Sequence, residues 1–506
     1  MSKLPWGLLA LSAGLLTACQ GEQPVPETDR TGGKRVGSID FHACTLDSGR
    51  DGKGVPAQCG TLDVPEDPSQ PQGRRIALNI AWLGPDEGRQ SEPDPVFFLA
   101  GGPGQAATEV AAAVVPALNK ISKQRDLFFI DQRGTGQSNP LDCRDAAGKA
   151  LELEVDGSQG SAEQLAYATA CLAGLEGRAD PRFYTTSHAI DDLEAVRQAL
   201  GMAKVNLIGG SYGTRVAQQY AARYPEQTRS LVLDGVVPND LVVGAEFAQT
   251  FQRAIEAQSA LCQADPACAK RFPTDTVTQL RQVVAELERS PRTVQYRDPS
   301  TAEWHDESLP AMAVTGLAFA FSYVPEMASL LPVVIDEAAH GRYQGLASLA
   351  RLAGQSMAGS INRGMQWSVI CSEDADRKDS VAAADASTLL GPETVEMFYA
   401  ACAVWPQGEP GKDFTRPLTT SVPTLLLSGE FDPVTPPTYG TRVAEGLPKG
   451  RHLVVRGRGH GTLSAGCMPD LLGQFVERAD ADSLDASCLD TLRPVPPFTT
   501  FNGWEP

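Results

Sequence analysis

A serine between glycines stands where an apolar run gives way to a helical pattern. Ser211 lies in the segment 209–213, which reads Gly-Gly-Ser-Tyr-Gly, after the largely apolar run 205–208 and before the helix-like stretch 214–224. A serine on such a sharp strand-to-helix turn projects its hydroxyl above the sheet, and neighbours larger than glycine would collide with the strand or the helix. The pattern therefore predicts that Ser211 is a nucleophile in acyl-transfer chemistry.

A serine hydroxyl is a weak nucleophile and needs an imidazole base, which in turn needs a carboxylate. In hydrolases with this strand-turn-helix nucleophile, the chain order is serine, acid, histidine. Of the six histidines, His452 and His460 lie beyond the strand-like run 424–427. His460 occupies the glycine-bearing loop 457–461, whereas His452 lies at the start of the preceding apolar run, which favours a structural role. His460 is therefore the predicted general base.

The acid has alternatives, because carboxylates follow two strand-like runs. Asp432 comes shortly after the run 424–427 and is followed by a turn with two prolines, which would hold a carboxylate beside the His460 loop. Asp234 follows the earlier run 231–233, where some hydrolases of this type place the acid. We predict Asp432 as the acid, with Asp234 as the alternative and Glu430 as a third candidate.

The oxyanion that forms during the attack needs two backbone N–H donors. One donor is predicted to be the amide of Tyr212, the residue after the nucleophile. The other should come from a loop after an early strand, and the glycine-rich segment 100–104 follows the apolar run 96–99 at that place. A glycine turn without chemistry is the alternative.

The elements that must hold these residues are visible as alternating patterns along the chain. Between residues 40 and 239, short apolar runs alternate with helical patterns, as a mostly parallel sheet with helices on both faces requires. Long alanine-, leucine- and glutamine-rich segments then indicate a large helical cap at 241–415. We expect a core of two parts, 39–240 with the nucleophile and 416–506 with the acid and the histidine.

The N-terminus has the features of an export signal. Lys3 precedes the apolar stretch 8–16, which is too short to span a bilayer as a helix. The segment 16–19, Leu-Thr-Ala-Cys, resembles the lipobox of bacterial lipoproteins, in which cleavage leaves a lipidated cysteine at the new N-terminus. We therefore expect a signal peptide at 1–18 and a lipid on Cys19. A simple secretory signal with an incidental cysteine is the alternative.

The residues after Cys19 bear on location and partners. The segment 19–38 is rich in proline, glycine and charge, as a solvated tether is, and Gln20 at its start is typical of outer-membrane lipoproteins. We expect a cell-envelope lipoprotein on the outer membrane, facing the periplasm. The chain has 43 Lys and Arg against 62 Asp and Glu, a net charge of −19. This charge disfavours nucleic acid as a partner and leaves the lipid anchor as the expected membrane contact.

The cysteine count agrees with export to an oxidising compartment. Of the 11 cysteines, ten are left when Cys19 is reserved for lipid, and an even number favours disulfides. A metal site is the rival interpretation, but the chain contains no Cys-x-x-Cys or Cys-x-x-His spacing, so no metal is predicted. Pairing of chain neighbours gives the hypothesis Cys44–Cys59, Cys143–Cys171, Cys262–Cys268, Cys371–Cys402 and Cys467–Cys488.

Several motifs together resemble one family. The segments 101–104 (Gly-Gly-Pro-Gly), 131–138 (Asp-Gln-Arg-Gly-Thr-Gly-Gln-Ser) and 209–213 resemble the prolyl and tripeptidyl aminopeptidase family of α/β-hydrolases. The resemblance covers roughly residues 44–488. It departs from the pattern of prolyl aminopeptidases at Ala100, where a histidine is usual. The segments 367–374, 432–436 and 459–461 resemble the tripeptidyl aminopeptidase branch.

The resemblance implies an α/β-hydrolase fold and an exopeptidase without metal or organic cofactor. The enzyme would remove single residues or tripeptides from short peptides with a free N-terminus, through an acyl-enzyme intermediate. Ser211 would be the nucleophile, His460 the general base and then acid, and Asp432 the residue that orients His460. The backbone amides of Gly102 and Tyr212 would form the oxyanion hole.

An aminopeptidase must also recognise an α-ammonium group, which a buried carboxylate does well. Glu373 and Asp374, at the end of the 367–374 segment, are the candidates. The alternative is that both are solvated acids in an acidic chain. Trp405 is a candidate for lining the pocket, although core packing is the simpler interpretation for a lone tryptophan.

Other functions share parts of this pattern. A carboxylesterase or lipase would use the same triad and differ in the cap pocket, and a non-enzymatic scaffold would retain the fold without its chemistry. Epoxide hydrolase or dehalogenase chemistry is excluded, because it requires an aspartate where Ser211 stands.

Overall fold

The computed structural model describes most of the chain. The predicted signal peptide, Cys19 and most of the predicted tether lie outside the described residues. Among the described residues, no helix combines the length and the hydrophobicity that a membrane span requires. The described residues are 33–47, 54–85, 90–145, 147–151, 160–381 and 386–503.

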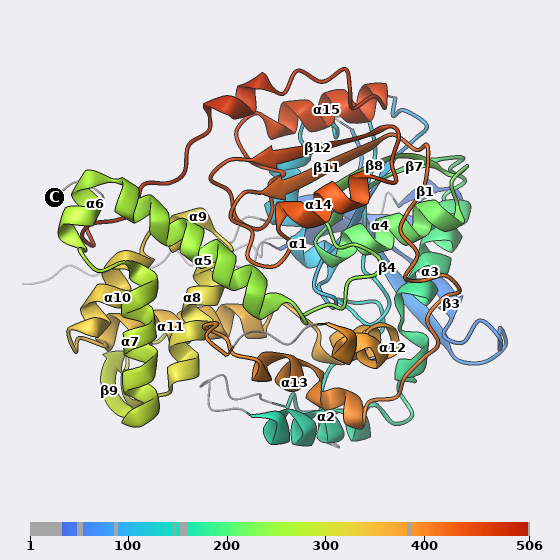
Figure 1. Ribbon diagram of the computed structural model, residues 1–506. Coiled ribbons are helices and arrows are strands. Elements are labelled where there is room, and N and C mark those ends of the chain that lie inside the picture. Colours follow the sequence, from blue (N-terminus) through green and yellow to red (C-terminus); the bar gives the residue numbers. More distant parts are fainter. Residues whose placement is uncertain are drawn as a thin grey trace, which may run out of the picture.

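A ten-stranded sheet forms the centre of the described structure (Figure 1). Its strand order is β1-β2-β3-β4-β6-β5-β7-β8-β11-β12; the pairs from β1 to β6 are antiparallel and those from β6 to β12 are parallel. This agrees with the predicted, mostly parallel sheet. The strands are β1 (Lys34–Val36), β2 (Ile39–Leu46), β3 (Val55–Pro65), β4 (Arg75–Leu83), β5 (Val96–Leu99), β6 (Leu127–Ile130), β7 (Val205–Gly210), β8 (Thr228–Asp234), β11 (Thr424–Gly429) and β12 (Gly450–Val455).

Helices cover both faces of the sheet, because successive side chains of a strand point to opposite sides. In β6, Phe128 and Ile130 join one apolar core, whereas Leu127 and Phe129 join the other. In Figure 1, α15 lies on one side of β11 and β12 and α14 on the other. One face carries α1 (Ala107–Val114) and α15 (Met468–Arg478); the other carries α3 (Thr186–Ala199), α4 (Tyr212–Arg223) and α14 (Pro437–Ala444).

The chain between β8 and β11 builds the cap. One part is a lobe with an apolar core of its own, at the left of Figure 1. It contains an antiparallel hairpin of β9 (Arg292–Arg297) and β10 (Trp304–Leu309), which the sequence analysis did not predict. The helices of this lobe are α5 (Phe247–Ala264), α6 (Pro266–Arg271), α7 (Thr276–Arg289), α8 (Ala311–Ser322), α9 (Pro325–Ala328), α10 (Leu331–Ala339) and α11 (Gln344–Ala358).

The other part of the cap packs directly on the sheet layer. It contains α12 (Arg363–Glu373) and α13 (Glu393–Tyr399), next to α2 (Ser161–Leu175) from the first half of the chain. Met365, Trp367 and Ile370 of α12 belong to the same apolar core as the strands. The segment predicted as one helical cap thus consists of a separate lobe and a part that shares the central core.

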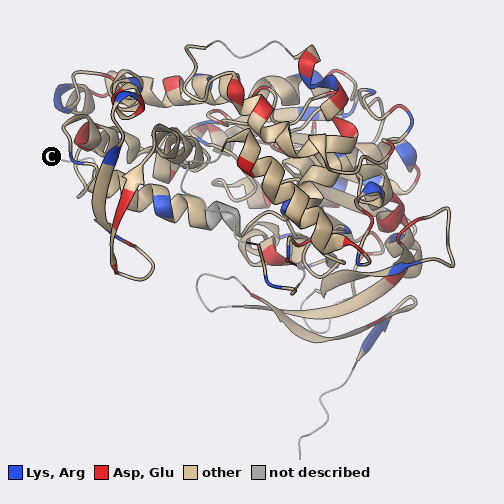
Figure 2. Ribbon diagram, turned by 90° about the horizontal axis from the view of Figure 1, so that it is seen from below, with Lys and Arg blue, Asp and Glu red and all other residues tan. Residues whose placement is uncertain are grey.

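β1 pairs with β2 and lies within the predicted tether 19–38, so the sheet begins before the predicted boundary. Acidic and basic residues are interspersed over the elements of the described structure (Figure 2). The structure links ten cysteines in the pairs that the sequence analysis proposed: Cys44–Cys59, Cys143–Cys171, Cys262–Cys268, Cys371–Cys402 and Cys467–Cys488.

Candidate active site

Ser211 is the residue at the turn between β7 and α4. Its backbone has φ 53° and ψ −125°, a strained conformation for a residue with a Cβ. The Ser211 amide donates a hydrogen bond to the Asp234 carbonyl oxygen at 2.8 Å, which ties the turn to β8. A Cβ at Gly209 would lie 2.4 Å from the carbonyl oxygen of Gly213, and one at Gly213 would lie 2.2 Å from that of Leu99. Close packing therefore requires both glycines of the motif.

His460 and Asp432 meet beside this turn. The His460 Nδ1 atom lies 2.8 Å from Asp432 Oδ2. The other carboxylate oxygen accepts hydrogen bonds from the backbone amides of Val434 and Thr435, at 2.9 and 2.8 Å, so the proline-bearing turn holds Asp432 in place. Asp432 is buried, with a 2% exposed fraction. The structure thus brings the predicted base and the predicted acid into contact.

The end of β8 brings Ser211 and His460 to the same place. Gly235, which follows Asp234, has φ 70°, and a Cβ there would lie 3.1 Å from His460 Cε1. The chain therefore passes close to the imidazole just after the residue that binds the Ser211 amide. Ser211, His460 and Asp432 all lie after parallel strands, at the carboxyl edge of the sheet.

The charges around His460 favour its protonated form. Burial lowers the pKa of His460, but the Asp432 carboxylate and its hydrogen bond, together with the charge of Asp234, outweigh burial and hold the pKa above its usual value. The same hydrogen bond orients the ring with Nδ1 toward Asp432, which leaves Nε2 as the atom that can exchange a proton with a serine. This is the arrangement a general base needs.

The two other acid candidates hold loops rather than the imidazole. Asp234 accepts hydrogen bonds from the Thr462 amide and hydroxyl, both at 2.8 Å, and from the Leu463 amide at 3.2 Å. These contacts anchor the chain just after His460. Burial raises the pKa of Asp234. Glu430 accepts from the Gly457 amide at 2.8 Å, at the start of the same loop.

Thr435 is a site residue that the sequence analysis did not identify. Its hydroxyl donates to Asp432 Oδ2 at 2.8 Å and also lies 3.1 Å from His460 Nδ1. Thr435 is itself buried. Thr435 lies three residues after Asp432, in the same proline-bearing turn. This position in the sequence could have identified it.

We expect that Thr435→Val lowers kcat/KM about tenfold, since a buried carboxylate loses one hydrogen-bond donor worth somewhat over 1 kcal/mol. The measurement is the steady-state hydrolysis of a chromogenic ester and of a peptide anilide. Thr435→Ser keeps the hydroxyl and should retain most of the activity. Equal activity of Thr435→Val and the unmodified protein would show that the hydroxyl is dispensable.

The predicted oxyanion loop lies against the nucleophile. A Cβ at Gly101 would lie 3.0 Å from the Ser211 Cβ, so the loop after β5 directly contacts the turn. Gly102 has φ 107°, and a Cβ there would lie 2.7 Å from the Gly104 amide nitrogen. Tyr212 is the first residue of α4 and follows Ser211 directly. The two predicted donor residues therefore flank Ser211.

The 131–138 loop supports the site through internal contacts. Asp131 is fully buried and accepts hydrogen bonds from Asn79, from the amide of Gln137, and from the amide and hydroxyl of Thr108 on α1. The Arg133 guanidinium binds both oxygens of Asp192 at 2.6 Å. These contacts agree with the structural role expected for this loop.

Glu373 and Asp374 bind protein groups, which differs from their predicted role in recognising a substrate amine. Asp374 is fully buried, and its two oxygens bind the guanidinium groups of Arg215 and Arg377 at 3.2 and 2.6 Å. Glu373 is also buried, and both of its oxygens accept hydrogen bonds from Thr186. Both carboxyl groups are engaged in internal contacts, and their role in recognising a substrate amine stays a prediction.

Trp405 is buried, packs against Trp367 and donates to the Ser368 hydroxyl at 3.0 Å, which is core packing.

Within the described residues, no three His, Cys, Asp or Glu side chains gather as a metal site would require. A pocket borders the oxyanion loop, lined by residues that include Ala100, Gln105 and Gln132.

Comparisons with known proteins show the family of the chain. The model of the α/β hydrolase fold family matches residues 94–464. The serine protease Hip1 of Mycobacterium tuberculosis is 28% identical over 468 residues, which cover 85% of this chain and 87% of that protein. The tripeptidyl aminopeptidase of Streptomyces lividans is 31% identical over 210 residues, which cover 39% of this chain and 38% of that protein.

A solved structure also matches. The proline iminopeptidase of Mycobacterium smegmatis has a TM-score of 0.38 and 16% identity, and the match covers 84% of this chain and 100% of that chain. The family match spans most of the chain, from the residues before β5 to those after His460. The family match confirms the predicted fold class, and the chain belongs to the α/β hydrolase fold family.

Proposed function

We propose that this protein is a serine aminopeptidase that releases single residues or tripeptides from the free N-terminus of short peptides. The central observation is the 2.8 Å contact between His460 Nδ1 and Asp432, next to the strained turn that carries Ser211. Acyl transfer to a serine requires a base that is oriented by a buried carboxylate, next to a serine on such a turn. The serine protease and tripeptidyl aminopeptidase among the sequence relatives support a serine peptidase.

The residues perform this reaction in two halves. Ser211 Oγ adds to the substrate carbonyl carbon while its proton passes to His460 Nε2, and Asp432 stabilises the resulting imidazolium. The oxyanion accepts hydrogen bonds from the backbone amides of Gly102 and Tyr212. The tetrahedral intermediate then loses its C–N bond, and His460 gives the proton to the leaving amine. Water attacks the acyl-enzyme in the same way, which releases the N-terminal fragment and restores Ser211.

The position of the cap supports cleavage near a chain end. The Tyr323 carbonyl, at the end of α8, accepts a hydrogen bond from the His460 amide at 2.8 Å, and the two rings lie 5.2 Å apart, edge to face. On the other side of Ser211, the Asn362 amide before α12 donates to the Gly104 carbonyl at 2.8 Å. The cap therefore contacts both the histidine loop and the loop after β5, which favours short peptides over loops of folded proteins.

We also propose that the protein is exported and lipid-anchored through Cys19, at the outer membrane. The lipobox-like segment 16–19 supports the anchor. The five disulfides support an oxidising compartment such as the periplasm. Peptides of the cell envelope would then be the accessible substrates.

The proposal is tested by comparing a tripeptidyl p-nitroanilide with its N-acetylated form and with p-nitrophenyl acetate. We expect kcat/KM for the free-amine anilide to exceed that for the blocked anilide by at least about 10²-fold, because a site built to bind an ammonium group leaves polar groups unpaired with the blocked substrate. Hydrolysis of the ester alone would instead identify a carboxylesterase. Equal rates on free and blocked anilides would identify a peptidase without N-terminal selectivity.

A further inference from the structure

A chain of buried hydrogen bonds lies behind the residue that follows the nucleophile. The Tyr212 hydroxyl lies 2.5 Å from the Thr186 hydroxyl, which donates to Glu373 Oε2 at 2.9 Å. The Thr186 amide donates to the other Glu373 oxygen at 2.6 Å, and the Gln132 side chain donates to the Tyr212 hydroxyl at 3.3 Å. Tyr212, Thr186 and Glu373 are each at most 2% exposed. The side chain of Tyr212 is therefore held by α3, by α12 and by the 131–138 loop.

The opposite end of α12 contacts the other side of the oxyanion hole. Asn362 caps the helix by accepting from the Met365 amide at 2.9 Å, and its own amide donates to the Gly104 carbonyl at 2.8 Å. A Cβ at Gly104 would lie 2.5 Å from the Asn362 carbonyl oxygen, so the loop and the helix start are in close contact. Helix α12 thus reaches from the loop of Gly102 to the side chain of Tyr212.

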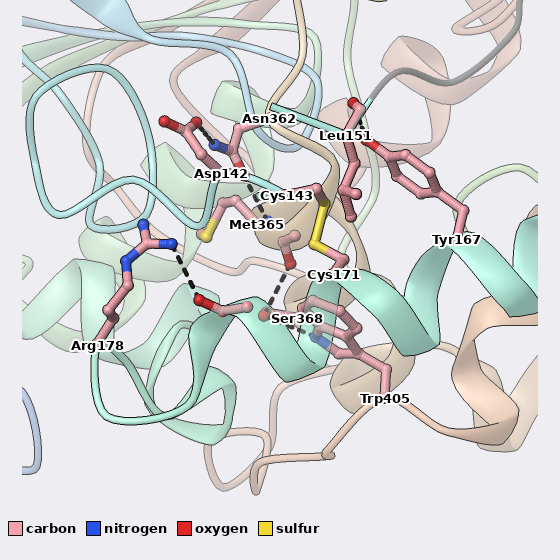
Figure 3. The surroundings of a disulfide bond; sticks show 12 residues. Asp142, Cys143, Leu151, Tyr167, Cys171, Arg178, Asn362, Met365, Ser368 and Trp405 are labelled. Carbon is pink, nitrogen blue, oxygen red and sulfur yellow. Dashed lines mark hydrogen bonds between the residues drawn. A yellow bond between two sulfur atoms is a disulfide. The ribbon is translucent and has the colours of Figure 1, made fainter. Parts of the chain in front are cut away.

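Covalent and polar contacts fix α12 at both ends. Near its C-terminus, Cys371 is joined to Cys402. Near its N-terminus, the Asn362 side chain donates to Asp142 at 2.9 Å, and the adjacent Cys143 is joined to Cys171 of α2 (Figure 3). A helix that is held in this way can transmit a fixed geometry to the groups at its two ends.

We propose that α12 sets the geometry of the oxyanion hole, and that Thr186 and Glu373 are positioning residues that fix Tyr212 from behind the active site. Neither residue has to touch the substrate. Their effect is on the backbone amide of Tyr212, which has to point at the oxyanion. This inference rests on the proposed acyl transfer at Ser211, and it replaces the role in amine binding that the sequence suggested for Glu373.

The protonation state of Glu373 enters the same argument. The charged and titratable groups around it are Arg215 and Tyr212 on α4 and Asp374 beside it, while Arg377 binds its backbone carbonyl. Burial raises the pKa of Glu373 to about 8, against the lowering effect of Arg215. The carboxyl group is therefore neutral at pH 7. Ionisation above pH 8 places a negative charge behind the site where the oxyanion forms, which disfavours the transition state.

The first test is Thr186→Val, which removes the hydroxyl and keeps the branched shape. We expect kcat to fall about tenfold on both p-nitrophenyl acetate and a free tripeptidyl anilide, with KM within about twofold. A displaced oxyanion donor stabilises the transition state less well, whereas the binding of the substrate is unchanged. Thr186→Ser restores the hydroxyl and should recover kcat. Thr250→Val is the matched control, because Thr250 is an equally buried threonine in α5 of the cap lobe.

The second test is Glu373→Gln, whose amide cannot ionise and offers one acceptor oxygen and one N–H donor group in place of two acceptor oxygens. We expect kcat at pH 7 to fall less than in Thr186→Val, and we expect the variant to lack the decline in kcat that is predicted for the unmodified protein near pH 8. Thermal melting monitors folding of every variant. Unchanged kcat in a folded Thr186→Val variant would overturn the proposal. So would a Glu373→Gln variant that raises KM for free-amine substrates alone, since Glu373 would then bind the amine.

The two proposals fail in different ways. If the protein hydrolyses the ester and not the free-amine anilide, the aminopeptidase function is wrong, whereas the effect of Thr186→Val on ester turnover still tests the positioning role. If the anilide is cleaved and Thr186→Val has no effect on either substrate, the positioning role is wrong and the aminopeptidase function stands.

Discussion

Replacing Ser211 with alanine is expected to lower kcat by about 10⁴- to 10⁶-fold, the range found when the nucleophile of a serine hydrolase is removed. The acyl-enzyme cannot form without the hydroxyl, and the remaining oxyanion donors and binding contacts supply only a small residual rate. The measurement is the turnover of a free tripeptidyl anilide, together with labelling by a fluorophosphonate. Both the turnover and the label should be lost.

A second serine separates this effect from a general loss of structure. Ser259 of α5 is buried, and within the described part of the chain its hydroxyl has no hydrogen-bond partner, so Ser259→Ala removes a serine hydroxyl that lies away from the turn. We expect this variant to keep its activity and its label. A Ser211→Ala variant that retains more than about a hundredth of the activity, or that is still labelled, would contradict the assignment of Ser211 as the nucleophile.

The features that could be predicted from the sequence depend on neighbours along the chain. The turn at Ser211 requires a strand before it, a helix after it and glycines on both sides, and all of these lie within about twenty residues. Asp432 could be selected from its position after a strand and before a proline-bearing turn. The strand pattern, such as the alternation in β6, follows from the two buried faces of the sheet. Features that depend on such local patterns can therefore be predicted from the sequence.

The features that could not be predicted depend on distant partners. Glu373 binds Thr186, which is 187 positions away, and Asp374 binds Arg215, which is 159 positions away. Nothing near these two acids in the sequence shows that their oxygens already bind protein groups, so the sequence suggests that they are available for a substrate amine. The hairpin of β9 and β10 was missed for another reason: it is a short, largely exposed ribbon between helices.

Replacing Asp432 with asparagine is expected to lower kcat/KM by about 10³- to 10⁴-fold, because the amide no longer holds the imidazole in the required tautomer. The pH profile should change as well. His460 acts as a base only when neutral, so kcat/KM rises with pH through its pKa. Burial lowers that pKa and Asp432 raises it above its usual value. Loss of the carboxylate should therefore move the acidic side of the kcat/KM profile to lower pH, which is measured between pH 4 and 9.

Asp234→Asn is the companion variant, since Asp234 is the rival acid. Its carboxylate accepts three hydrogen bonds from Thr462 and Leu463, and an amide can accept only part of these. We expect a loss of activity of about tenfold through displacement of the His460 loop, with a smaller shift of the pH profile, because Asp234 acts on His460 only through its charge. The opposite order, with Asp234→Asn inactive and Asp432→Asn mildly affected, would assign the acid to β8. His460 contacts Asp432 directly, whereas Asp234 binds the chain after His460. The shift of the acidic side of the kcat/KM profile should therefore be large when the acid that orients the base is replaced. It should be small when the acid that holds the loop is replaced.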